Sequence, residues 1–166
     1  MISLQDKSVL QKFDFKDPAI WLASWFGSGF IKPAPGTWGT LAALPFGILF
    51  LNMSPILLII AILLIIPLGL WASCRFTKTA GEKDSSMIVI DEVAGMWIAL
   101  IPVFGQSLLF VLLAFALFRF FDILKPWPIS WLDKNINGAA GVMADDILAG
   151  AFAAFCLIGL QYVGLG

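Results

Sequence analysis

The sequence contains no histidine, only two cysteines and little charge. Without histidine there is no His-ligated zinc site, no histidine nucleophile and none of the chemistry of His-dependent membrane phosphatases. A Cys-x5-Arg phosphatase loop is also missing. Cys74 and Cys156 fall at different depths of the predicted spans, about 20 Å apart at 1.5 Å per residue, so we expect two free thiols.

Charged residues make up 13% of the 166 residues, hydrophobic residues make up 60%, and the mean hydropathy is +0.96. A soluble domain of this length could not cover so large an apolar core. We therefore predict an all-α polytopic membrane protein, a helical bundle that forms a single membrane domain over residues 1–166. The net charge of −1 offers no basic field for nucleic acid.

Five apolar runs have the character of membrane spans. The predicted spans are Trp38–Leu51, Pro55–Cys74, Met87–Phe104, Leu108–Ile123 and Val142–Val163. The first is short, which leaves a thin span or half of a re-entrant hairpin as alternatives. Ala19–Phe30 is also apolar, but Gly27 and Gly29 favour a re-entrant or interfacial segment.

Residues 1–18 are expected to be a frayed N-terminal tail or a short interfacial helix, with the helical bundle occupying 19–166. The apolar stripe of such a helix would contain Ile2, Val9, Leu10 and Phe13.

The basic residues predict the orientation in the membrane. With five spans, one face receives the N-terminus to Thr37, the Arg75–Ser86 loop and the Leu124–Gly141 loop. All ten basic residues belong to this face: Lys7, Lys12, Lys16, Lys32, Arg75, Lys78, Lys83, Arg119, Lys125 and Lys134. The opposite face has none. By the positive-inside rule the first face, with the N-terminus, is cytoplasmic, as in a multi-pass protein of a bacterial cytoplasmic (inner) membrane.

Five carboxylates lie at span ends on this face rather than in open loops. Asp91 and Glu92 begin the third span, Asp122 ends the fourth, and Asp145 and Asp146 begin the fifth. Ionisable groups just inside a bilayer are costly and usually mark an ion or substrate site. Helix capping is the alternative, because acids at helix N-termini are favoured by the dipole. Capping explains neither the doubled pairs nor Asp122 at a helix C-terminus, so we favour a site.

Clustered carboxylates without histidine are typical of a hard cation, most naturally Mg²⁺, which proteins hold with carboxylates, water and phosphate oxygens. The five acids are therefore the candidate catalytic and metal-binding residues. Arg119 lies one turn before Asp122 on the same helix face, and Lys125 follows. We interpret both as phosphate-binding residues; the alternatives are an Arg–Asp ion pair and a lysine that reaches to the lipid headgroups.

A loop rich in glycine and proline, GSGFIKPAPGTWGT, leads into the first span. Backbone N–H groups near Gly36 and the hydroxyls of Thr37 and Thr40 suit an anionic ligand at a helix N-terminus. Turns of this kind also precede many helices that bind nothing. Its position on the same face as the acids favours the binding role.

Four segments, in order, resemble the signature segments of the bacterial phosphatidylglycerophosphatase A family. They are GSGFIKPAPGTWGTLAALP, IVIDEVAGMWIAL, FRFFDILKPWPISWLD and GAAGVMADDILAG. The residues that match the family motifs are Gly36, Thr37, Asp91, Glu92, Arg119, Asp122, Lys125, Asp145 and Asp146. The resemblance implies a Mg²⁺-dependent enzyme of the cytoplasmic membrane that converts phosphatidylglycerophosphate into phosphatidylglycerol and inorganic phosphate.

We therefore predict a lipid phosphomonoesterase that acts on a phospholipid substrate at the cytoplasmic leaflet, with one carboxylate either activating water or attacking phosphorus. The alternative is a cation or proton transporter, which the placement of the acids at one interface disfavours. A CDP-alcohol phosphotransferase is a second alternative, but its Asp-x2-Asp-Gly-x2-Ala-Arg pattern is absent. The sequence does not indicate the oligomeric state.

The predicted sidedness is testable by cysteine labelling in a variant without Cys74 and Cys156. Lys83→Cys and Lys134→Cys should react with a membrane-impermeant maleimide only after cells are opened, because both positions lie on the basic face. Ser107→Cys should react while the cytoplasmic membrane is intact. Labelling of the Lys83→Cys variant from outside intact cells would invert the topology.

Overall fold

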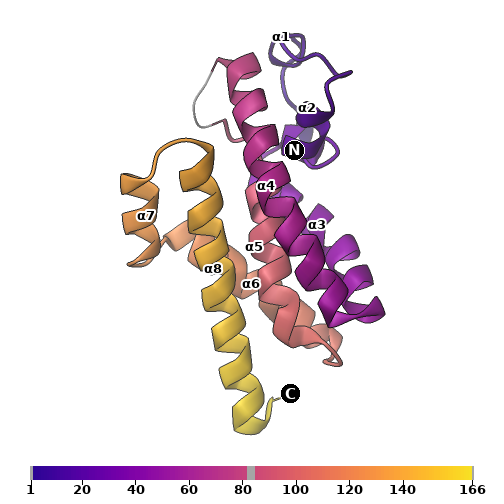
Figure 1. Cartoon of the computed structure of the whole chain (residues 1–166), viewed down its shortest axis with the longest axis vertical. Coiled ribbons are helices and arrows are strands. Elements are labelled where there is room, and N and C mark those ends of the chain that lie inside the picture. Colours follow the sequence, from indigo (N-terminus) through magenta and orange to yellow (C-terminus); the bar gives the residue numbers. More distant parts are fainter. Residues whose placement is uncertain (1, 82–84, 166) are drawn as a thin grey trace.

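The computed structural model describes residues 2–81 and 85–165, about three quarters of which are helical (Figure 1). The helices are α1 (Lys7–Leu10), α2 (Pro18–Ala23), α3 (Pro35–Met53), α4 (Pro55–Ala80), α5 (Ile90–Leu100), α6 (Leu108–Leu124), α7 (Ile129–Asn135) and α8 (Ala139–Leu160), with helical turns η1 (Ser28–Phe30), η2 (Ile101–Val103) and η3 (Gln161–Leu165). Strand β1 (Ser3–Leu4) pairs with β2 (Ile31–Lys32) in antiparallel register. The all-α prediction is confirmed. Lys83, one of the proposed labelling positions, lies outside the described residues.

Each predicted span corresponds to a helix, but the count of five spans is not confirmed. Three helical stretches in the described residues are long and apolar enough to cross a membrane: Pro35–Met53, Pro55–Ala80 and Ala139–Gly164. Helix α6 has 17 residues and α5 only 11, which correspond to about 26 Å and 16 Å. A hydrocarbon core is about 30 Å thick. The structure therefore supports a membrane protein with three candidate spans.

Helix α5 is the central helix of the bundle. It packs against α3, α4, α6 and α8, and all but two of its eleven residues are buried. A helix that is apolar on every side is buried either by lipid or by protein, and sequence periodicity does not separate the two. In this fold protein covers α5, so its apolar run reflects a core rather than a lipid-facing span.

Glycines allow α5 and α8 to approach closely. A Cβ atom on Gly150 would overlap the carbonyl oxygen of Gly95, and one on Gly95 would overlap the carbonyl oxygen of Asp146 and the ring of Phe118. Small residues at such crossings bring two helix backbones together. Because Asp91 precedes Gly95 by four residues and Asp146 precedes Gly150 by four, the same crossing brings these two acids together.

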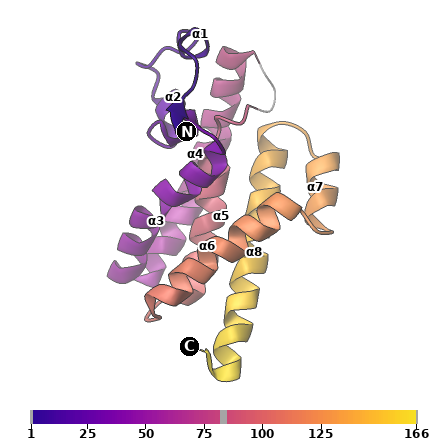
Figure 2. The same ribbon diagram turned by 180° about the vertical axis from the view of Figure 1, so that it is seen from behind.

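The N-terminal segment packs against the end of α4 (Figures 1 and 2). The ring of Phe13 is buried, 4.6 Å from the ring of Phe76, and Val9 and Leu10 pack against the same cluster. Of the predicted stripe, only Ile2 is exposed. The apolar side of this segment therefore covers protein.

The chain direction places several helix ends together. Helices α3, α5 and α8 begin, and α4 and α6 end, at the end of the bundle that also carries the N-terminal segment and α7 (Figures 1 and 2). The assignment of this end to one face of a membrane stays a prediction. Cys74 and Cys156 are free, as predicted.

The α5–α8 crossing predicts how glycine substitutions behave. Gly150→Ala should lower the thermal unfolding temperature and reduce activity, because overpacking against the Gly95 carbonyl forces the two helices apart. Gly159→Ala is the matched control on the same helix, since a Cβ there meets nothing within 4 Å. Thermal unfolding in detergent checks both. Equal unfolding temperatures for the two variants would contradict the tight crossing.

Candidate active site

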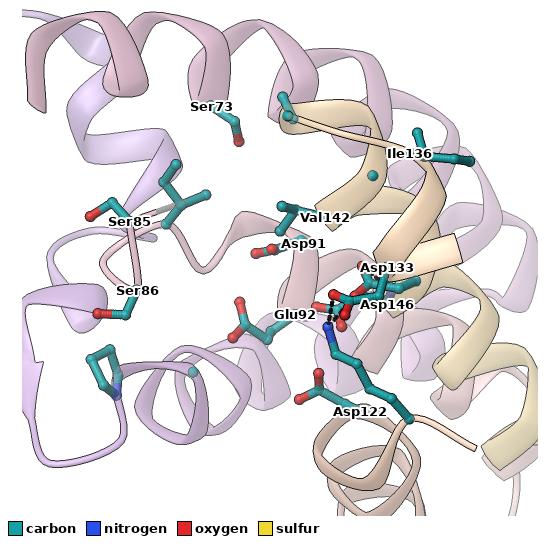
Figure 3. A pocket seen from close by; sticks show the side chains of 18 of the residues that line it. Ser73, Ser85, Ser86, Asp91, Glu92, Asp122, Asp133, Ile136, Val142 and Asp146 are labelled. Carbon is teal, nitrogen blue, oxygen red and sulfur yellow. Dashed lines mark hydrogen bonds and ion pairs between the residues drawn. The ribbon is translucent and has the colours of Figure 1, made fainter. Parts of the chain in front are cut away.

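A cavity of about 450 Å³ lies at this end of the bundle (Figure 3). Its charged lining comes from α5, α6, α7, α8 and the residue after α6. These residues are Asp91, Glu92, Arg119, Asp122, Lys125, Asp133, Asp145 and Asp146. The structure thus brings together the five predicted acids and both predicted cations.

Three carboxylates form the buried centre of the cavity. Oxygen atoms of Asp91, Glu92 and Asp146 all lie within 4.8 Å of one another. Asp91 Oδ1 and Glu92 Oε2 are buried and have no hydrogen-bond partner among the described residues. Buried, unpaired carboxylate oxygens are costly unless a cation or a donor compensates them. This set of hard oxygen donors fits a divalent cation such as Mg²⁺.

The two acids of the α8 pair take different partners. Asp146 joins Asp91 and Glu92, whereas Asp145 Oδ2 accepts a hydrogen bond of 2.5 Å from Lys125 Nζ. Neighbouring residues on a helix point about 100° apart, which accounts for the split.

Helix α8 begins at Ala139, three residues before the predicted start of the span at Val142, so its acids lie about two turns into the helix rather than at its first residues. Asp145 and Asp146 follow the first residue by six and seven positions, and the N-cap is Gly138. Asp91 and Glu92 lie in the first turn of α5 and Asp122 in the last turn of α6, as predicted. Capping therefore does not account for the α8 pair.

Arg119 links α6 to the buried acids. Its Nη1 atom lies 2.5 Å from Asp122 Oδ2, 3.8 Å from Glu92 Oε1 and 3.4 Å from Thr40 Oγ1. The Arg119 side chain is only 14% exposed. The ion pair with Asp122, which the sequence left as an alternative, is present, and it holds the guanidinium against the cavity.

Lys125 points into the cavity. Its Nζ atom donates to Asp133 Oδ1 and Asp145 Oδ2, both at 2.5 Å. Burial lowers the pKa of Lys125, but the two hydrogen-bonded carboxylates outweigh it and hold the pKa above its usual value. Lys125 is therefore a fixed positive charge between α7 and α8.

The predicted Gly36–Thr40 turn is instead the start of α3, because the helix begins at Pro35 after the left-handed Ala34 (φ +58°). Gly36 lines the cavity, and a Cβ atom there would overlap Glu92 Oε1. Thr40 is buried and donates to the carbonyl oxygen of Gly36. Neither Thr37 nor Thr40 lines the cavity. Their contact with an anion remains a prediction. Thr40 touches the site only indirectly, by accepting a hydrogen bond from Arg119 Nη1.

Several polar residues of the cavity were not predicted. They are Asp133 and the neutral side chains of Ser73, Thr77, Ser85, Ser86 and Asn137. No pattern in the sequence singled out Asp133, because its contact with Lys125 arises only from the reversal of the chain between α6 and α7. The spacing of Ser73 and Thr77, four residues apart in an apolar helix, could have indicated one polar face.

Comparison with known proteins places the chain among lipid phosphatases. The phosphatidylglycerophosphatase A of Haemophilus influenzae is 39% identical over 160 residues, which cover 96% of this chain and 98% of that protein. The phosphatidylglycerophosphatase A of Escherichia coli is 41% identical over 133 residues, 80% and 77% of the two chains. A Bacteroides thetaiotaomicron protein provisionally named a phosphatidylinositol-3-phosphatase is 38% identical over 149 residues, 82% and 89%. No solved structure matches the chain significantly.

The family model of phosphatidylglycerophosphatase A matches residues 21–161. This range contains every charged residue of the cavity, from Asp91 to Asp146. The chain therefore belongs to the phosphatidylglycerophosphatase A family of lipid phosphatases.

Proposed function

We propose that the protein removes the terminal phosphate of phosphatidylglycerophosphate, giving phosphatidylglycerol and inorganic phosphate, with Mg²⁺ as cofactor. The reaction takes place at the cytoplasmic face of a bacterial cytoplasmic membrane. The observation that carries the proposal is the buried triad of Asp91, Glu92 and Asp146 beside Arg119, in a chain of this family. Two of its relatives are named for this activity.

The transporter alternative is not supported. The relatives are named as phosphatases. The charged side chains of the cavity also gather at one end of the bundle, whereas a pathway across a membrane needs polar groups at several depths.

Asp91, Glu92 and Asp146 would hold the cation, since they bring several hard oxygen atoms together and two of these lack other partners. Bound Mg²⁺ supplies positive charge that orients the terminal phosphate and offsets the charge that develops on its oxygens. Asp122 fixes the Arg119 guanidinium beside the triad, where its planar donors suit phosphate oxygens. Lys125, held by Asp133 and Asp145, contributes a second positive charge.

The surroundings of the cavity suit a lipid whose acyl chains stay in the bilayer. Ile123 lines the cavity and is 65% exposed, so the cavity borders the apolar outer surface of α6. The exposed tryptophans Trp127 and Trp131 lie just beyond this helix end. Tryptophan is enriched at membrane–water interfaces. A headgroup could therefore enter the cavity from the interface without leaving the membrane, and the basic residues at this end favour the cytoplasmic interface.

Phosphate release by the purified protein tests the activity and the cofactor together. Phosphatidylglycerophosphate should be hydrolysed with Mg²⁺ and not after metal stripping in excess EDTA, because carboxylates alone do not neutralise a phosphomonoester. Phosphatidylinositol-3-phosphate is the comparison lipid. Full turnover in EDTA would contradict the metal proposal. Failure to release phosphate from phosphatidylglycerophosphate in the presence of Mg²⁺ would contradict the proposal that this lipid is the substrate.

Asparagine substitutions separate a catalytic site from helix capping. Asp91→Asn, Asp122→Asn and Asp145→Asn should each lower kcat by orders of magnitude while the protein still inserts and folds, since asparagine caps helices well but carries no charge. Asp14→Asn is the control, because Asp14 is exposed and lies outside the cavity. Near-normal turnover in two of the three cavity variants would contradict a catalytic role for these acids.

A further inference from the structure

Ser73 is a buried hydroxyl group that faces the cavity from α4. It is only 4% exposed, lines the cavity, and directs its Oγ atom into the space between the helices (Figure 3). Among the described residues its Oγ atom forms no hydrogen bond, and it is not one of the enclosed polar atoms, so it is open to the cavity.

Other hydroxyls in the helices of this protein are satisfied locally. Ser24 Oγ donates to the carbonyl oxygen of Ile20, and Thr40 Oγ1 donates to that of Gly36, both at 2.7 Å. Ser73 makes no such bond to the carbonyl oxygen of Gly69, four residues earlier, although this is the usual choice for a hydroxyl in a helix. Because its Oγ atom is open to the cavity, Ser73 is available to pair with water or with a polar group of a ligand that enters there.

Ser73 belongs to a neutral side of the cavity. Thr77 follows it by one turn on the same helix face, and Ser85 and Ser86 line the cavity nearby. Figure 3 shows Ser73, Ser85 and Ser86 on one side of the cavity and Asp133 and Asp146 on the other. Asp91 and Glu92 lie between these two groups in the same view, so the hydroxyls line one side of the cavity and the charged residues line its centre and other side.

We infer that Ser73 is a specificity-determining residue that hydrogen-bonds the free hydroxyl of the substrate's headgroup glycerol while the charged side binds the terminal phosphate. The inference rests on the proposed function. In phosphatidylglycerophosphate this hydroxyl is on the carbon next to the phosphorylated carbon, so it enters the cavity with the phosphate. A hydroxyl both donates and accepts hydrogen bonds, which matches Ser73 to a neutral alcohol.

The test changes the enzyme and the substrate together. Ser73→Ala is compared with the unaltered protein on phosphatidylglycerophosphate and on an analogue whose middle headgroup hydroxyl is replaced by hydrogen. On the natural lipid kcat/KM should fall about five- to tenfold, as expected for a lost neutral hydrogen bond. On the deoxy analogue kcat/KM should be the same for both proteins, because the partner of Ser73 is already missing.

Two controls separate this role from a structural one. Ser73→Ala should not lower the thermal unfolding temperature, since alanine favours a helix and leaves no unpaired hydroxyl. Thr79→Ala removes an exposed hydroxyl on the same helix outside the cavity and should leave kcat/KM unchanged on both lipids.

Equal losses on both lipids, or no loss on either, would overturn the inference; the second result would mean that only water pairs with Ser73. If the unaltered protein releases phosphate from the deoxy analogue but not from phosphatidylglycerophosphate, the proposed substrate fails, and the inference fails with it. Turnover of the natural lipid without a selective effect of Ser73→Ala would overturn this inference alone.

Discussion

The close crossing of α5 and α8 is the constraint on which the candidate active site depends. Gly95 and Gly150 leave no room for a side chain between the two backbones, so the helices meet at a fixed height and rotation. The acids one turn before each glycine then converge from opposite sides. A bulkier crossing would separate Asp91 from Asp146, and the buried carboxylate triad would not form.

The buried acids that converge here concentrate negative charge, and the other residues of the cavity compensate only part of it. Arg119 pairs with Asp122 and approaches Glu92, and Lys125 pairs with Asp133 and Asp145. Oxygen atoms at the centre of the triad still lack partners among the described residues. The uncompensated carboxylate oxygens suit a bound cation. The cation and the two basic side chains together then suit a phosphate.

Several features were readable from the sequence because they depend on composition and local order. The helical membrane character, the five acids, Arg119 and Lys125, and the free cysteines were all predicted, since charge is scarce in this chain and each charged residue inside an apolar run stands out. The positions of α3, α4, α5, α6 and α8 were also predicted, whereas α7 lies in the segment Leu124–Gly141 that was predicted to be a loop. The predicted number of membrane-spanning helices was not confirmed, because a helix covered by protein and one covered by lipid share the same apolar pattern.

Only the tertiary structure decided which partner each polar side chain of the cavity contacts. Sequence alone determined that carboxylates and cations gather at one end, because the chain alternates direction and its charges recur at the same ends. It did not separate Asp145 from Asp146, or bring Asp133 to Lys125, because those contacts depend on helix rotation and on the reversal before α7. The position of Ser73 depends on tertiary structure in the same way, because the packing of α4 against its neighbours buries this residue and turns its hydroxyl toward the cavity.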